Sequence, residues 1–253
     1  MDLLEVDNVS VRFGGIKALD GLSFSIGTGQ ICGLIGPNGA GKTTIFNVVS
    51  RIYAPTEGRV TFDGKDLLKV PPHRIAHQGI FRTFQNLALW PRLTVLENVM
   101  IGTHSRTSVG FARAPFRIKT RGEERRTAME AYDILDELGL SDYAFRPAAG
   151  LPFGTLKRIE LARALAGKPR LLMLDEPANG LTHEEVLSLG DLVKAIRDRY
   201  SLTVLLVEHH MALVNGISDK VVAMDFGLKI AEGAPRDVAS NPKVIEAYLG
   251  APA

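Results

Sequence analysis

Three short apolar runs stand out along the chain, at residues 31–35, 171–174 and 202–207. None of them alternates with polar residues, and continuous runs of this length are typical of parallel strands that are covered on both faces. A helix is predicted between the last two runs, over about residues 183–198. This part of the pattern predicts an α/β fold with a mostly parallel core sheet and helices on both of its faces.

A second pattern appears nearer the start of the chain, where apolar and polar residues roughly alternate. It covers residues 3–13, 22–26 and 59–62, and the third segment is followed by Asp63-Gly64. Alternation is typical of half-buried strands, and an Asp-Gly pair marks a hairpin turn. We therefore expect an antiparallel β-subdomain beside the parallel core.

Between about residues 87 and 165 the pattern becomes helical, and residues 90–165 contain no convincing strand. Residues 123–140 have helical spacing, with apolar positions at Met129, Tyr132, Ile134, Leu135 and Leu138. We interpret the whole segment as an inserted helical subdomain. The predicted organisation is a single domain over 1–253, with a nucleotide-binding core and β-subdomain at 1–86 and 166–253 and the helical subdomain at 87–165.

Composition narrows the class of protein. The 253 residues are 45% hydrophobic, which is enough for a substantial core, and the net charge of +2 argues against general nucleic-acid binding. The single cysteine, Cys32, falls inside a predicted strand and is interpreted as a small buried apolar residue in a reducing compartment. The first residues lack the pattern of a signal peptide, and no apolar run approaches the length needed to cross a membrane.

The first apolar run leads into a glycine-rich segment that reads G-x-x-x-x-G-K-T, the P-loop pattern. Its glycines allow the backbone to turn its N–H groups towards one point, next to the N-terminus of a helix over residues 43–49, where an anion is favoured. Lys42 is predicted to reach the β- and γ-phosphates, and the Thr43 hydroxyl to bind Mg²⁺. The predicted nucleotide-binding residues of the loop are Gly36, Asn38, Gly39, Ala40, Gly41, Lys42, Thr43 and Thr44.

The second apolar run ends in two carboxylates, Asp175 and Glu176, which fits a Walker B motif. We predict that Asp175 holds Mg²⁺ through its water shell and that Glu176 polarises the attacking water. Polar residues often end a strand without any such role, but the P-loop upstream favours the functional interpretation.

With these motifs the chain resembles an ATP-binding-cassette (ABC) ATPase over nearly its whole length. The resemblance implies that Gln85 senses Mg²⁺ and the attacking water, and that His209 contacts the γ-phosphate. It places Phe13 against adenine, although a residue at a strand end could equally belong to the core. It also implies a dimer of ATPase subunits, identical or paralogous, in which each contributes a signature segment to the other's ATP. The expected cofactors are ATP and Mg²⁺.

Two segments depart from the family pattern. The signature Leu-Ser-Gly-Gly-Gln appears here as residues 151–155, with Pro152 in place of the serine. The contact to ATP would then come from the Gly154 N–H and from the following helix, which we predict over 156–166 with Thr155 as its cap. The aspartate of the D-loop is replaced by Thr182, which begins a capping box with Glu185.

Several segments are similar to the ATPases of branched-chain amino acid importers, including 82–86, 177–181, 207–211 and 241–250. The resemblance implies a peripheral protein on the cytoplasmic face of the membrane, bound to integral permease subunits and served by a solute-binding protein. Relatives that import urea or amides, exporter ATPases, a P-loop kinase and a soluble scaffold ATPase of the iron–sulfur assembly type remain alternatives. Residues 105–126 carry seven basic and two acidic residues. Such a segment is either a solvated loop or a face directed towards anionic lipid headgroups.

Overall fold

The computed structural model describes residues 1–83, 87–106 and 120–249. The chain divides into two compact units, one of Met1–Ile75 with Arg170–Ala253 and the other of Ala76–Pro169. Among the described residues, no helix is long and apolar enough to cross a membrane.

The first unit contains a parallel sheet built from the predicted apolar runs. Its strands are β3 (Ile31–Ile35), β7 (Leu171–Asp175), β8 (Thr203–Val207) and β9 (Lys220–Asp225), with β10 (Leu228–Gly233) antiparallel to β9 at the edge, in the order β10-β9-β3-β8-β7. Every residue of β3, β7 and β8 is buried, as expected for strands covered on both faces. The α/β class with a mostly parallel core sheet is therefore confirmed, whereas β9 and β10 were not predicted.

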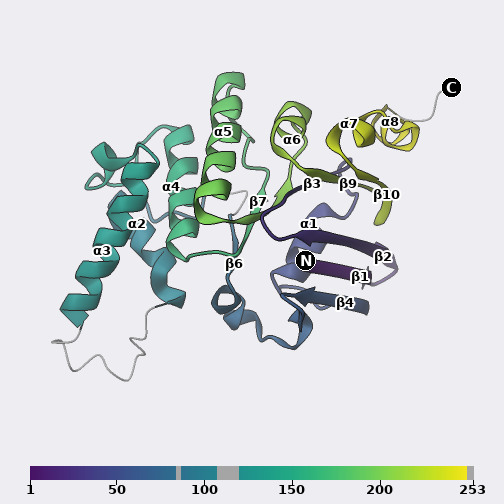
Figure 1. Cartoon of the computed structure of the whole chain (residues 1–253), viewed down its shortest axis with the longest axis horizontal. Helices are drawn as coiled ribbons and strands as arrows, with labels where there is room; N and C mark the ends of the chain where they lie inside the picture. Colours follow the sequence, from purple (N-terminus) through teal and green to yellow (C-terminus); the bar gives the residue numbers. More distant parts are fainter. Residues whose placement is uncertain (84–86, 107–119, 250–253) are drawn as a thin grey trace. The chain divides into compact units, whose positions relative to one another are not determined.

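Helices cover both faces of this sheet. They are α1 (Lys42–Val49), α5 (His183–Tyr200), α6 (Met211–Ile217), α7 (Pro235–Ala239) and α8 (Pro242–Leu249). Figure 1 shows α6, α7 and α8 on one side of β3, β9 and β10, with α1 on the other. The predicted capping box begins α5, since the Thr182 hydroxyl accepts from the Glu185 N–H and the Glu185 carboxylate accepts from the Thr182 N–H.

The predicted antiparallel sheet is also present. It has the order β2-β1-β4-β5, with β1 at Asp2–Phe13, β2 at Ile16–Gly27, β4 at Glu57–Phe62 and β5 at Lys65–Asp66. Asp63 and Gly64 connect the last two strands with φ angles of 51° and 70°, as in a two-residue hairpin turn. Short 3-10 turns at Leu67–Lys69 and Pro72–Arg74 follow.

The Ala76–Pro169 unit is mainly helical. Helices α2 (Val95–Ile101), α3 (Thr120–Glu137) and α4 (Phe153–Ala166) pack on one another, and the unit also contains the short strand β6 (Ile80–Arg82). Its 3-10 turns are Ala76–Gln78, Gly102–Ser105 and Ser141–Tyr143. The basic segment predicted at 105–126 lies largely outside the described residues.

The predicted start of α4 was wrong. The helix begins at Phe153, and Leu156 N–H already donates to the carbonyl of Pro152 at 3.0 Å. Thr155 therefore lies inside the first turn and does not cap the helix. Proline at the N-cap position explains the shift. Its ring fixes φ, and its missing N–H costs no hydrogen bond at this position, because the first N–H groups of a helix have no partner within the helix.

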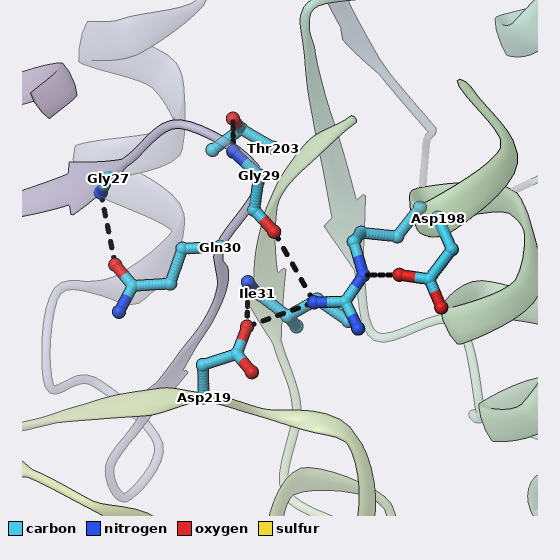
Figure 2. A network of polar contacts seen from close by, with 8 residues as sticks. Gly27, Gly29, Gln30, Ile31, Asp198, Thr203 and Asp219 are labelled. Carbon is cyan, nitrogen blue, oxygen red and sulfur yellow. Dashed lines mark hydrogen bonds and ion pairs between the residues drawn. The ribbon is translucent and has the colours of Figure 1, made fainter. Parts of the chain in front are cut away.

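A polar network fixes the segment that leads into β3 (Figure 2). Asp219 Oδ2 accepts from the Ile31 N–H at 2.7 Å and pairs with Arg197 Nη1 at 3.2 Å. Gly29 N–H donates to the Thr203 hydroxyl at 2.9 Å, which ties the start of β3 to the start of β8. These contacts hold the amino ends of the central strands, while the predicted site residues follow their carboxyl ends.

Replacing Asp219 with Ala should lower the free energy of unfolding of this unit by about 1–3 kcal/mol, because the N–H of buried Ile31 loses its acceptor. Urea titration measures this loss. Asp198→Ala is the matched control, since Asp198 pairs with the same arginine, Arg197, and its side chain is 70% exposed; it should change stability by less than about 0.5 kcal/mol. If the two variants lose the same free energy of unfolding, the hydrogen bond between Ile31 and Asp219 contributes nothing to stability.

Candidate functional site

The P-loop leaves the buried carboxyl end of β3 in a conformation that only glycine accepts. Gly36 has a φ of 152°, and a Cβ atom there would lie 2.2 Å from the carbonyl oxygen of Met224. Gly41, at the N-cap of α1, has a φ of 100°, and its Cβ would lie 2.6 Å from the carbonyl oxygen of Ala18. The predicted need for glycine at these two positions therefore has a steric cause in neighbouring backbone.

The loop ends at a helix N-terminus that no side chain caps. The first N–H groups of α1, those of Lys42, Thr43 and Thr44, have no partner within the helix by its geometry. Earlier in the same loop, Asn38 and Gly39 are exposed. Such N–H groups together with the helix dipole favour an anion at this point.

Lys42 is nearly buried beneath the loop. Its Nζ donates to the carbonyl oxygens of Gly36 at 2.6 Å and Pro37 at 2.9 Å. Burial lowers the pKa of Lys42, and the nearby carboxylates of Glu176 and Asp175 oppose that change.

The two carboxylates lie at the carboxyl end of β7, at the same edge of the sheet as the P-loop, because β7, β8 and β3 are parallel. Asp175 is the last residue of the strand and is 1% exposed. Glu176 has a φ of 48°, which is unfavourable for a residue with a Cβ atom, and its N–H donates to the carbonyl of Val207 at 2.9 Å. This turn directs Glu176 out of the strand, and strained residues of this kind are frequent in active sites.

Glu208 joins this turn to the segment that carries His209. Its carboxylate is fully buried, and Oε1 accepts from the Ala178 N–H at 2.8 Å. Oε2 accepts from the N–H groups of His209 at 2.9 Å and His210 at 3.0 Å. Glu208 was not predicted as a site residue, because a carboxylate after a strand is usually solvated and the contact between the two loops is not visible in the sequence.

Phe13 ends β1 and is 45% exposed. Its ring meets the edge of the Tyr53 ring, with 5.1 Å between the centroids and 70° between the planes. The exposed part of Phe13 leaves a face available for stacking, and Tyr53, which the sequence analysis also missed, restricts the orientation of the ring.

Two further residues were predicted to belong to the site. Gln85 lies outside the described residues, and Gly154 belongs to the Ala76–Pro169 unit, in the first turn of α4. That helix start carries no side-chain cap and no acidic residue in its first turn. The assigned roles of Gln85 and Gly154 stay predictions.

Comparison with known families gives two matches. Residues 19–179 match the family model described as ABC transporter. Residues 229–253 match a second model, described as branched-chain amino acid ATP-binding cassette transporter.

Curated relatives match over nearly their whole length. The chain is 41% identical over 249 residues to the high-affinity branched-chain amino acid transport ATP-binding protein BraF of Pseudomonas aeruginosa, with 98% of each chain covered. It is 38% identical over 252 residues to the protein LivG of Escherichia coli, which has the same description, again with 98% of each covered.

Solved structures with the same fold include a nucleotide-free ATP-binding cassette from an ABC transporter, at 34% identity and a TM-score of 0.86, covering 99% of this chain and all of that one. Another is a cassette in its ADP conformation, at 35% identity and a TM-score of 0.87 with the same coverage.

Proposed function

Because this chain belongs to the ABC transporter family and is an ATPase of that family, we propose that it powers the import of branched-chain amino acids through separate membrane subunits. The observation that carries the choice of solute is the match of residues 229–253 to a family model specific for branched-chain amino acid transporters. Full-length relatives named for the same solutes support it.

The P-loop would hold the phosphates of ATP. The N–H groups at the start of α1 point at the anion, and the small residues of the loop let the phosphates approach the backbone. Lys42 would exchange its two carbonyl partners for the β- and γ-phosphate oxygens. Phe13 would stack on the adenine ring.

The donor chemistry of Thr43 and Asp175 fits Mg²⁺, because a hydroxyl and a carboxylate are the oxygen ligands that this ion prefers. When bound, the ion would neutralise charge on the phosphate oxygens. Glu176 would accept hydrogen bonds from the attacking water and orient it, and His209 would contact the γ-phosphate. Gln85 would complete the group around the metal and the water.

The site described above is half of the proposed catalytic unit. The other half would be the start of α4 from a second ATPase subunit, with the Gly154 N–H directed at the γ-phosphate. ATP would favour the closed dimer only if it binds that state more tightly than the open one. Opening and closing would act on integral membrane subunits at the cytoplasmic face of the membrane, to which a solute-binding protein delivers the amino acid. The division into a core with β-subdomain and a helical subdomain is part of this proposal.

Transport by the reconstituted complex tests the proposal. The chain is purified with the membrane subunits that it retains and incorporated into liposomes with the solute-binding protein, and ATP-dependent uptake of labelled leucine and urea is measured. We expect leucine uptake, with loss of both uptake and ATP hydrolysis in Lys42→Ala. Lys69→Ala, which removes a lysine whose side chain is 83% exposed, is the control and should retain both.

Two outcomes would contradict the proposal. Uptake of urea without uptake of leucine would show that the transported solute is not a branched-chain amino acid. ATP hydrolysis by a chain that retains no membrane subunit would instead favour a soluble scaffold ATPase.

A further inference from the structure

The last helix, α8, is anchored next to the P-loop. Its residue Val244 is 4% exposed and belongs to an apolar cluster that includes Ile35, the residue just before the P-loop. The other buried members of that cluster come from α6, β9 and α7: Val214, Val221, Ala223 and Val238. The position of α8 is thus set by the same core that supports the end of β3.

Tyr248 follows Val244 by one helical turn and lies on the same face of α8. Its hydroxyl oxygen accepts a hydrogen bond from the Gly36 N–H at 2.8 Å. Gly36 is buried, so this N–H has no access to water as an alternative partner. A tyrosine hydroxyl is neutral at physiological pH, and burial raises the pKa of Tyr248 further.

Gly36 is held on its other side by Lys42. Its carbonyl oxygen accepts from Lys42 Nζ at 2.6 Å. One residue of the P-loop therefore receives a contact from the C-terminal helix at its N–H and from Lys42 at its carbonyl. Because glycine has more conformational freedom than other residues, a contact that fixes its backbone restricts the loop strongly.

We propose that Tyr248 is a positioning residue for the P-loop, through which α8 holds the Gly36 backbone in the conformation that binds ATP. The inference rests on the proposed role of the P-loop in binding phosphate. It gives the segment that distinguishes this branch of the family, residues 229–253, a direct function at the nucleotide site. Without the hydroxyl, a smaller fraction of molecules would have the loop ready to bind, and the apparent Kd would rise in inverse proportion to that fraction.

Tyr248→Phe in the full chain isolates the hydroxyl. The Kd for ATP should rise by about 3- to 10-fold, with a parallel rise in KM and a kcat within about 2-fold of the parent, as expected for a loss of preorganisation. Tyr248→Leu, which also removes the ring, should raise the Kd to a similar extent. Ile245→Ala is the control, because this side chain on the same helix is 44% exposed and has no bond to the P-loop; its Kd should match the parent.

Amide hydrogen exchange at Gly36 gives a second readout that does not depend on ATP. The exchange rate should rise in Tyr248→Phe and stay unchanged in Ile245→Ala. If Tyr248→Phe leaves both the exchange rate and the Kd unchanged, or if Ile245→Ala raises the Kd as much as Tyr248→Phe does, the inference is wrong. A parent protein that fails to bind ATP would instead overturn the proposed function, so the two failures are distinguishable.

Discussion

Glu176→Gln is expected to lower kcat for ATP hydrolysis by about 100-fold or more, because the amide cannot accept a proton from the attacking water as a carboxylate can. The two side chains have nearly the same shape, so the Kd for ATP should change little. Hydrolysis separates the subunits in the proposed cycle, so this variant should also accumulate as a dimer when ATP is present. Phosphate release and size-exclusion chromatography with ATP measure the two effects.

Glu184→Gln provides the matched control for Glu176→Gln. Glu184 is an exposed residue in the first turn of α5, and its replacement removes the same charge without touching the site. It should hydrolyse ATP at the parent rate and remain monomeric under the same conditions. Hydrolysis at the parent rate by Glu176→Gln would show that another group activates the water.

Glu208→Gln should impair both stability and catalysis. The parent carboxylate accepts from three N–H groups, two on one oxygen and one on the other. An amide has a single oxygen, so its NH₂ group must face backbone donors at one end. We expect a loss of about 2–4 kcal/mol in the free energy of unfolding, since buried donors are left without acceptors. We also expect kcat to fall by about 10-fold or more, because the Glu176 turn and the His209 segment are no longer held together.

Asp219→Ala separates these two effects. Its loss of stability arises at the amino end of β3, across the sheet from Glu208, and the contacts of Glu208 stay in place. At a temperature where both variants are folded, its kcat should equal that of the parent. If Glu208→Gln shows the parent kcat under the same conditions, Glu208 contributes to stability alone.

The sequence predicted the parts of this fold in which chemistry and structure depend on neighbouring residues. The buried runs 31–35 and 171–174 lead directly to Gly36 and Asp175, so locating those strands also located the motifs. The capping box of Thr182 and the hairpin turn at Asp63-Gly64 are equally local, and both are confirmed.

Contacts between distant segments could not be predicted in this way. The bond between Gly36 and Tyr248 joins residues 212 positions apart, and that between Ala178 and Glu208 joins residues 30 apart. The apolar positions 221–224 offered a signal for β9, but a run of four between polar residues also suits a helix. Thr155 was mistaken for a cap because a threonine before an apolar helix is a frequent start, whereas here Pro152 sets the first turn.

The steric and hydrogen-bonding partners of the P-loop come mainly from segments far downstream of it in the sequence, which affects when the loop forms during synthesis. Gly36 fits against Met224, Ala40 accepts from the Gly227 N–H, and β3 lies between β8 and β9. Residues 36–44 leave the ribosome before these partners do. A nascent chain therefore has the phosphate-binding residues before it has the supports that shape them, so we expect it to bind ATP only after residues 220–227 have been synthesised.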